Sequence, residues 1–410
     1  MKRLTTLALF ALVSSLLAAC SGQSGGSIPS QPQSSTQSQS VSQPSTTRTV
    51  QSIPSTHTLS PAQINHWTPM YTVIKSPNLD LSKIDSVGFI RNTIPYFSRS
   101  VISPLNGKTY TSRIVGADPA TSNTTTDVVY VPIVVVWKFP DGTVLDPRNA
   151  ACNDSVSVEN RFFKGPSFNA QNVMSNGIQV GPAQLNDADQ RAEFWSEVST
   201  NTSYHTNLVT FSPPVVLIEN APSGSRTFGG VCSGAGHRIG TIDINAFDNI
   251  IIGIANAYSS PTEIPMMLTY NVFQTVGGGC CVIGFHQAYS RPTGTQTLAI
   301  AAYNDSGIFN VPIEDIHAWN HEIGELFNDP FVTNFVPAWG HVGQVGGCQD
   351  NLEVGDPLTG TPFIVVRNGF TYHPQELVFY DWFYRTPSEG TGGLYSFRGS
   401  FTGVQGKCTP

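Results

Sequence analysis

A short stretch near residue 320 combines side chains that can bind a metal ion and activate water. His321, Glu322 and Glu325 form the pattern H-E-x-x-E. In a helix, residues four apart lie on the same face, so His321 and Glu325 can both reach one metal ion. Glu322 then lies beside the metal, where it can take a proton from water as the glutamate of H-E-x-x-H zinc peptidases does. The spacing therefore predicts a metal-dependent hydrolase with Glu322 as its base.

His317 offers a second pairing, because it lies four residues before His321. His317, His321 and Glu325 cannot all share one ion, since positions 317 and 325 are roughly 12 Å apart along a helix axis. The 317/321 pair also has Ala318 at the position where the base is needed. We therefore favour His321 with Glu325 and keep His317 as an additional candidate.

A helix within residues 311–330 must position these side chains. Pro312 suits its start and Pro330 its end. The apolar residues at helical spacing, which are expected to face the core, are Ile316, Trp319, Ile323 and Phe327. The alternative reading is an ordinary amphipathic helix, whose polar face is hydrated and binds no metal.

The composition limits the class of protein. The chain has 410 residues, enough for two average domains or one large one. Charged residues make up 12% of it, about half the usual share, and there are 37 glycines and 29 prolines. These features favour a strand-rich, loop-rich exported protein. The net charge of −7 gives no support to nucleic-acid binding. Beyond the N-terminus the sequence has no long apolar run, which argues against a polytopic membrane protein.

The N-terminus has the pattern of an export signal. Lys2 and Arg3 precede an apolar run to Leu17, and a pair of alanines then leads to Cys20. The end of this run resembles the bacterial lipoprotein cleavage site, so residues 1–20 are predicted to be a lipoprotein signal peptide with Cys20 as the lipidated residue. The protein is then expected outside the cytoplasm, in the bacterial cell envelope, with a lipid as its membrane anchor. The alternative is an ordinary secretory signal in which the cysteine is incidental.

Two further segments and a set of disulfides are expected. Residues 21–58 are rich in serine, glutamine and proline and are predicted to be a disordered linker, followed by a single α+β domain over residues 59–410. Six cysteines remain after Cys20, which permits three disulfides in an oxidising compartment and leaves 15 possible pairings. Cys280 and Cys281 are expected to pair with different partners.

The pattern of apolar residues predicts several elements. A β-branched and aromatic run at residues 127–139 indicates a strand, and Asp141-Gly142 indicates the turn of a hairpin. The further elements expected are a helix over residues 184–198 and strands over residues 206–219, 238–252 and 296–303. On the strand over residues 238–252, Asp243 and Asn245 would face the same side, either hydrated or as weak ligands for calcium.

A metal site on a two-ligand helix needs a third ligand from elsewhere in the chain. Glu353 and Asp356 are the acidic candidates, and His341 is the basic candidate. His286 lies before the helix, and a single histidine in such a position is more often structural. Aromatic residues between positions 370 and 384 are expected to form core rather than a sugar-binding platform.

The order of these motifs resembles a family of secreted bacterial proteins and, more distantly, the plant phosphate-induced (exordium-like) proteins. The shared order is H-E-x-x-E, then T/N-D/N-P, then E-I-G-D, and a glycine-aromatic-histidine element comes first. The matching segments of this sequence are residues 321–325, 328–330, 353–356 and 284–286, with a further similar helical segment at 184–195. One departure is Cys348, which precedes the Glu-Val-Gly-Asp run, whereas in many members a cysteine follows it.

The resemblance implies a zincin-like α+β fold and a zinc-dependent peptidase. Carried over by position, His321 and Glu325 match the metal ligands and Glu322 matches the base. Glu353 or Asp356 matches the third ligand, with Glu353 placed first. The remaining candidates for the site are His286, His317 and Asp329.

A donor set of one histidine and two carboxylates suits zinc, but also manganese or calcium. It neutralises more of the ion's charge than two histidines would, so water at this ion is expected to be a weaker acid. The leading interpretation is a lipid-anchored zinc peptidase acting on a peptide or protein. The alternatives are a cell-surface protein that is not an enzyme and holds a structural ion, and a polysaccharide-binding module.

Overall fold

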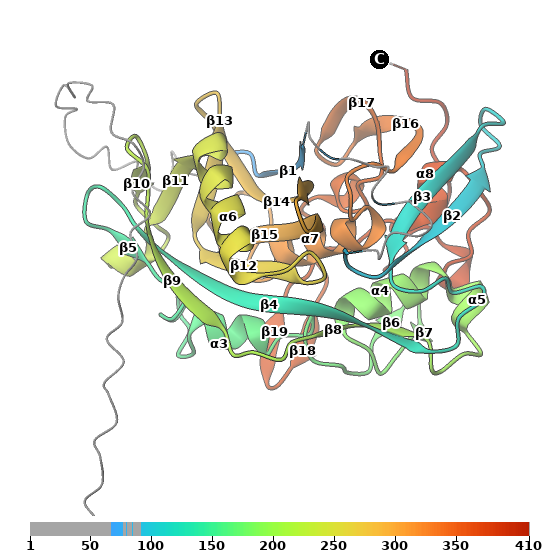
Figure 1. Cartoon of the computed structure of the whole chain (residues 1–410), viewed down its shortest axis with the longest axis horizontal. Coiled ribbons are helices and arrows are strands. Elements are labelled where there is room, and N and C mark those ends of the chain that lie inside the picture. The colour runs from blue at the N-terminus through green and yellow to red at the C-terminus, as the bar shows by residue number, and fades with distance from the viewer. Residues whose placement is uncertain (1–66, 77–78, 80–83, 85–91, 410) are drawn as a thin grey trace, which may run out of the picture. The chain divides into compact units, whose positions relative to one another are not determined.

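One mixed β-sheet, seen across the centre of Figure 1, organises the protein in this computed structural model. The structure describes residues 67–76, 79, 84 and 92–409. The predicted signal peptide with Cys20 and all of the predicted linker, residues 21–58, lie outside these described residues. The expectation of a strand-rich fold is confirmed.

The main path of the sheet has the strand order β10-β11-β13-β14-β15-β12-β4-β5. In chain order these strands are β4 (Thr125–Lys138), β5 (Val144–Leu145), β10 (Arg226–Phe228), β11 (Ile239–Asp243), β12 (Ile264–Tyr270), β13 (Val272–Val276), β14 (Gly279–Arg291) and β15 (Gly294–Tyr303). Three further strands join it, namely β1 (Met70–Lys75) on β14, and β8 (His205–Val209) and β9 (Val215–Asn220) on β4. β14 runs antiparallel to β13 and β15, whereas β1 runs parallel to β14.

The sheet is covered by a helix on each face, because successive side chains of a strand point to opposite sides. Helix α6 (Ile244–Tyr258) packs on one face through Phe247 and Ile251, against residues such as Ile300. Helix α7 (His317–Asn328) packs on the other face, against residues such as Ala299 and Ala301. These two small side chains let α7 lie close to β15, and every residue of α7 is buried. The helix is therefore a core element and has no hydrated polar face.

The predicted core contacts of this helix are confirmed, although the helix is shorter than the expected range of 311–330. The four apolar residues that the sequence assigned to the core all belong to the cluster between α7 and the sheet. The first turn begins at His317 and not near Pro312, because Asp315 has a left-handed backbone (φ 44°) that a helix cannot contain. Asp329 ends the helix.

The C-terminal third of the chain supplies the elements that surround α7 in addition to the sheet. It contains the hairpin of β16 (Phe335–Val342) and β17 (Val345–Asn351), the turn η2 (Asp356–Leu358), the hairpin of β18 (Val365–Arg367) and β19 (Phe370–Tyr372), and the short helices α8 (Tyr380–Tyr384) and η3 (Thr391–Gly393). Tyr372, Trp382 and Phe383 are buried in the hydrophobic core. The expectation that these aromatic residues form core is confirmed, so these three cannot serve as a sugar-binding platform.

The remaining elements surround these layers. They are the hairpin of β2 (Tyr96–Ile102) and β3 (Thr109–Val115), α3 (Val158–Phe163), the hairpin of β6 (Met174–Ser175) and β7 (Ile178–Gln179), α4 (Leu185–Glu193), α5 (Trp195–Val198) and η1 (Ala235–His237). The helix predicted over residues 184–198 is thus two helices with Phe194 between them, and the strand predicted over 206–219 is β8 followed by β9. Among the described residues, no helix is long and apolar enough to cross a membrane.

The strand predicted over residues 238–252 is wrong beyond its first half. The chain leaves the sheet at Asp243 and continues as α6. The Asp243 carboxylate accepts hydrogen bonds from the backbone N–H groups of Asn245 and Ala246, which makes it the N-cap of the helix. The isoleucines that suggested a strand belong to α6, and Ile251 and Ile254 among them are buried against the sheet. Asp243 and Asn245 therefore do not face one side of a strand, and the weak calcium site considered there has no basis.

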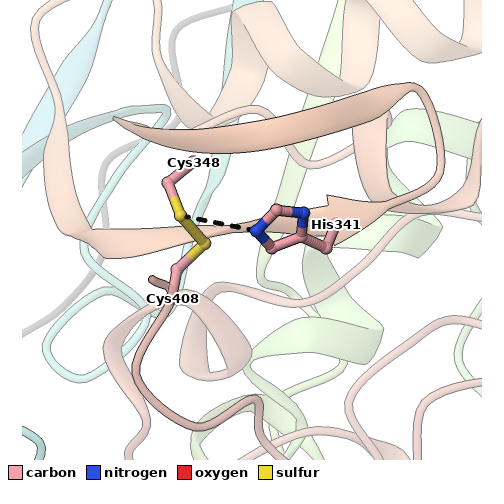
Figure 2. Close-up of side chains that lie close together, drawn as sticks. All are labelled: His341, Cys348 and Cys408. Carbon is pink, nitrogen blue, oxygen red and sulfur yellow. Dashed lines mark hydrogen bonds between the residues drawn. A yellow bond between two sulfur atoms is a disulfide. The ribbon is translucent and has the colours of Figure 1, made fainter. Parts of the chain in front are cut away.

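Three cysteine pairs lie at disulfide distance. Cys152 pairs with Cys232, Cys348 with Cys408, and Cys280 with Cys281. The expectation that the two adjacent cysteines bond to different partners is therefore wrong, because the other four cysteines already form two pairs. Figure 2 shows the pair that joins β17 to the C-terminal segment, with His341 beside it. His341 faces the peptide oxygen of Thr409 at 2.9 Å and lies outside the cluster described next.

Candidate metal centre

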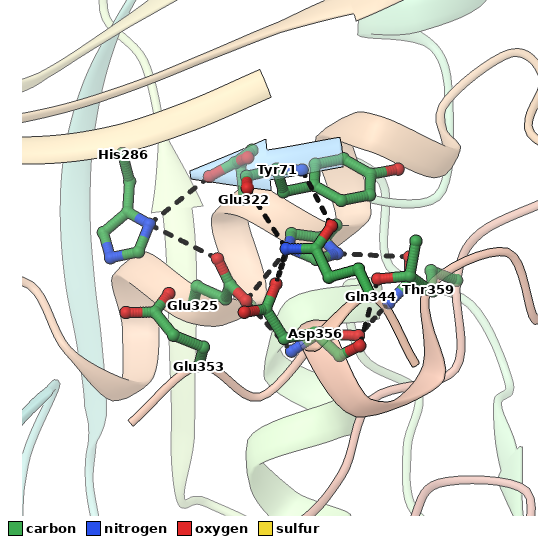
Figure 3. A network of polar contacts seen from close by, with 12 residues as sticks. Tyr71, His286, Glu322, Glu325, Gln344, Glu353, Asp356 and Thr359 are labelled. Atoms are coloured by element: carbon green, nitrogen blue, oxygen red, sulfur yellow. Dashed lines mark hydrogen bonds and ion pairs between the residues drawn. The ribbon is translucent and has the colours of Figure 1, made fainter. Parts of the chain in front are cut away.

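Six buried side chains from three parts of the chain meet beside the middle of α7 (Figure 3). Strand β14 contributes one histidine, α7 contributes three residues, and the segment after β17 contributes two carboxylates. We call this set the histidine–carboxylate cluster; it consists of His286, His321, Glu322, Glu325, Glu353 and Asp356. None of the six is more than 6% exposed. Two histidines and four carboxyl groups out of contact with water form an unusual core, in which either protons or a cation must compensate the charge of the carboxylates.

The first half of the cluster is formed by His321, Glu325 and Asp356. The Nε2 atom of His321 lies 2.9 Å from Glu325 Oε1 and 3.6 Å from Asp356 Oδ1. The predicted pair on α7 thus converges as the i,i+4 spacing requires. Asp356 faces His321, whereas Glu353, the first choice for a third ligand, is grouped with His286 and Glu325.

Hydrogen bonds fix which nitrogen of His321 carries the proton. The side-chain amide of Gln375 donates from Nε2 to the backbone oxygen of Gly355, so its Oε1 atom faces His321 Nδ1 at 3.1 Å. Because a carbonyl oxygen only accepts, Nδ1 must carry the proton. Burial lowers the pKa of His321 to about 4, so the ring is neutral and Nε2 presents a lone pair. That lone pair faces the oxygen of Glu325.

Two acceptors at 2.9 Å repel each other unless a cation or a proton lies between them. Glu325 Oε1 already accepts a hydrogen bond from the backbone N–H of Gly355, which favours the ionised carboxylate. Ligands bound about 2.0–2.1 Å from a tetrahedral ion lie roughly 3.3 Å from each other. The separations of 2.9 and 3.6 Å around His321 Nε2 bracket this value. The donor set therefore fits a divalent cation.

The second half of the cluster surrounds His286. Its Nδ1 atom lies 3.3 Å from Glu322 Oε2 and 3.5 Å from Glu325 Oε2. Ligand atoms of His286, Glu325 and Glu353 all lie within 4.8 Å of one another, as do those of His321, Glu322 and Glu325. Glu325 is thus common to both groups.

Burial raises the pKa of all four carboxyl groups. Loss of hydration is the largest cause for each, and neighbouring carboxylates add to it for Glu322, Glu353 and Asp356. The pKa rises to about 8 for both Glu325 and Asp356, and well above the usual range for Glu322 and Glu353. Among the described residues, their ion-pair partners are histidines. A bound cation would supply the positive charge that lets these carboxyls ionise.

Two glycines make room for the cluster. A Cβ atom at Gly284 would lie 2.7 Å from Cγ and 2.8 Å from Oε1 of Glu322. A Cβ atom at Gly355 would overlap the ring of His321. The glycines of the Gly-Phe-His and Glu-Val-Gly-Asp motifs are therefore explained by close approach of the backbone to the two central side chains of α7.

Replacing Gly355 by alanine is expected to displace the His321 ring and weaken metal binding about 10- to 100-fold, the usual cost of disturbing the surroundings of a ligand. The matched control is Gly346→Ala, where an added Cβ atom has no heavy atom within 4 Å. Competition of each purified variant with a chromogenic chelator measures the change. Equal metal affinities for the two variants would contradict the proposed packing.

Two candidates from the sequence do not join the cluster. Asp329 accepts hydrogen bonds from the backbone N–H groups of Thr333 and Asn334, so its carboxylate holds the turn after α7. His317 is fully buried one turn before His321, but it belongs to no group of converging ligands among the described residues. Burial lowers the pKa of His317 to about 3, so its ring is neutral.

Three further residues of the site were not anticipated. Tyr71 of β1 stacks on His321, with ring centroids 3.5 Å apart. Gln344 donates to Asp356 and exchanges two hydrogen bonds with the backbone of Tyr71. Gln375 orients His321 as described above. Tyr71 and the two glutamines are distant in sequence from α7, and an isolated tyrosine or glutamine carries no recognisable pattern.

A cavity of about 370 Å³ reaches the cluster between β1 and the β16–β17 hairpin. Its wall includes Tyr71, Gln344, Glu353 and Asp356. The cavity therefore offers a route for a small group to approach the carboxylates from the side of β1.

Comparisons of the chain with protein-family models, with curated proteins and with solved structures find no match. The case for a function therefore depends on the geometry of the cluster.

Proposed function

We propose that the protein is a metal-dependent hydrolase, most consistent with a zincin-like zinc peptidase that uses the H-E-x-x-E helix α7. The observation that carries the proposal is the neutral His321, whose free Nε2 lone pair faces the ionisable oxygen of Glu325 inside a fully buried cluster. His321, Glu325 and Asp356 would hold the ion. Zinc suits a histidine with carboxylates, and manganese and calcium are the alternatives.

A divalent ion bound there would polarise a carbonyl oxygen and lower the pKa of water. Glu322 would act as the general base. Its Oε1 atom is buried without a hydrogen-bond partner among the described residues, and its other oxygen lies beside His286. Such a carboxylate can accept a proton from water and pass it to a leaving amine. The raised pKa of Glu322 favours this return step.

The surroundings of the cluster favour an extended peptide as substrate. Strand β1 pairs in parallel with β14 from Met70 to Lys75, directly beside the histidine of that strand. At this histidine β14 is paired with β1 on one side and with β15 on the other, so a substrate peptide would have to take the place of β1. Recognition by strand addition is a common way of binding peptides.

Incubation with a diverse peptide library, followed by mass spectrometry, tests the proposal. Cleavage is expected in the presence of zinc and is expected to stop when a chelator removes the metal. Restoring activity with zinc after chelation supports a metal-dependent peptidase. The Tyr71→Ala variant, in which the ring that covers His321 is removed, should also be tested with metal bound. No cleavage by that metal-loaded variant would contradict the proposal.

Tyr71 is expected to limit access to the site, because its ring stacks on His321 and is 4% exposed. Tyr71→Ala should speed the removal of zinc by a chelator about tenfold and raise the rate of peptide cleavage. Thr72→Ala on the same strand is the control, since its side chain points to the opposite side. Identical rates of metal release from the two variants would show that the ring does not cover the ion.

The second candidate is a protein that is not an enzyme and uses the ion to stabilise its fold. The burial of all six members of the cluster favours it, because a structural ion needs no contact with solvent. The peptide experiment separates the two, since a structural ion gives stability without cleavage. In either case we propose a lipid-anchored location outside the cytoplasm, which the N-terminal sequence supports.

A further inference from the structure

The single ion proposed above uses only part of the histidine–carboxylate cluster. His321, Glu325 and Asp356 account for it, and Glu322 is the base. His286 and Glu353 then have no role, although both are buried, at 0% and 2% exposure. Burying an unused histidine and an unused carboxylate in the protein core is costly.

The two oxygens of Glu325 face different histidines. Oε1 lies 2.9 Å from His321 Nε2, and Oε2 lies 3.5 Å from His286 Nδ1. A carboxylate that presents one oxygen to each of two histidines has the geometry of a bridging ligand. The two groups of converging ligand atoms share this residue, with His321 in one group and His286 and Glu353 in the other.

The contacts of His286 also point to a ligand. Its Nδ1 atom is 3.3 Å from Glu322 Oε2 and 3.5 Å from Glu325 Oε2, longer than the roughly 2.7–2.9 Å of a charge-assisted hydrogen bond. The separation from Glu325 Oε2 is close to the roughly 3.3 Å expected between two ligands of a tetrahedral ion. Its Nε2 atom is buried and has no hydrogen-bond partner among the described residues. Figure 3 shows Glu353 beside this ring.

The charges of the cluster balance with two divalent ions. Glu322, Glu325, Glu353 and Asp356 carry four negative charges when ionised, and both histidines are neutral as ligands. One divalent ion compensates half of this charge, and a second compensates the remainder. In the described part of the chain, the groups that ion-pair with these carboxylates are the histidines themselves.

We propose that the cluster is a dinuclear metal centre, in which Glu325 bridges the first ion to a second ion held by His286 and Glu353. This inference rests on the proposed metal site and extends it. A second divalent ion would neutralise the charge that remains when only the first is bound. The chemical class of its ligands, one imidazole and carboxylates, suits zinc or manganese.

The test is the metal content of the full chain, loaded with zinc and dialysed, together with the electron paramagnetic resonance spectrum of the manganese form. Two equivalents of zinc and a spin-coupled manganese pair are expected in the unaltered protein. This measurement needs no variant, so a folding defect cannot obscure it. One equivalent with an uncoupled manganese spectrum would overturn the second site but leave the proposed function standing. No bound metal would overturn both.

Variants assign the ions to the two groups. His286→Ala is expected to hold one equivalent, and Glu325→Ala is expected to hold none because it removes the bridge. The matched control is His341→Ala, which changes an exposed histidine outside the cluster and should keep two. Circular dichroism verifies that each variant is folded. Two equivalents in a folded His286→Ala protein would overturn the assignment of the second ion to His286.

Discussion

Replacing Glu322 by glutamine is expected to leave the metal content unchanged and to reduce kcat for peptide cleavage by about 10²- to 10⁴-fold, the usual contribution of a general base. Glutamine has nearly the same shape as glutamate, so the packing against Gly284 is retained. Its amide cannot accept a proton from water. A fluorogenic peptide found in the library screen gives kcat and KM, and elemental analysis gives the metal content.

The control for this variant is Asp189→Asn in α4. Asp189 is also a buried carboxyl group without a hydrogen-bond partner among the described residues, and burial raises its pKa, but it lies outside the cluster. We expect its activity and metal content to equal those of the unaltered protein. Full activity in Glu322→Gln would contradict the role of Glu322 as base. Loss of metal in that variant would instead identify Glu322 as a ligand.

Removing the metal is expected to make the thermal stability of the protein fall as the pH rises from 7 to 9. In the metal-free protein, burial raises the pKa of Glu325 and Asp356 to about 8, above the value of about 4 in an unfolded chain. The folded state therefore holds protons that the unfolded state has released. The stability from these groups is complete below about pH 4 and is lost as the pH passes through about 8.

These two groups contribute about 3 kcal/mol of loss across this range, or roughly 5 °C in Tm. Glu322 and Glu353, whose pKa values burial raises well above the usual range, add to the loss in the same direction. His321 does not contribute to the slope, because its pKa is lowered to about 4 and its unfolded value also lies below pH 7. Calorimetry at pH 7, 8 and 9 measures the effect, with the zinc-loaded protein as the control. That protein should show a smaller slope, because the ion keeps the carboxylates charged. Equal slopes with and without metal would show that the cluster binds no ion.

The sequence predicted the part of the site that lies on one helix. The spacing of His321 and Glu325 depends only on the period of an α-helix, and the structure brings them within 2.9 Å. The placement of His286 opposite them could be expected only from the order of motifs. The structure explains why positions 284 and 355 are glycines, because a Cβ atom there would overlap Glu322 and His321, respectively.

The rest of the site depends on contacts between distant parts of the chain. Tyr71 lies 250 positions before His321, and its stacking follows from the pairing of β1 with β14, which no local pattern indicates. The choice between Glu353 and Asp356 depends on how the chain turns after β17. The segment at residues 238–252 was predicted wrongly because isoleucine favours strands locally. The N-cap formed by Asp243 and the packing of α6 on the sheet stabilise a helix there instead.

The most direct test of the central claim is the metal content of the chain, purified without a histidine tag, beside the His321→Ala/Glu325→Ala double variant. The claim predicts bound zinc, manganese or calcium in the unaltered protein and its loss in the folded double variant. Zinc or manganese would support the hydrolase, and calcium would favour a structural role. Elemental analysis that finds no metal in either protein, even after incubation with zinc, would contradict the claim and make α7 a structural helix with a protonated polar core.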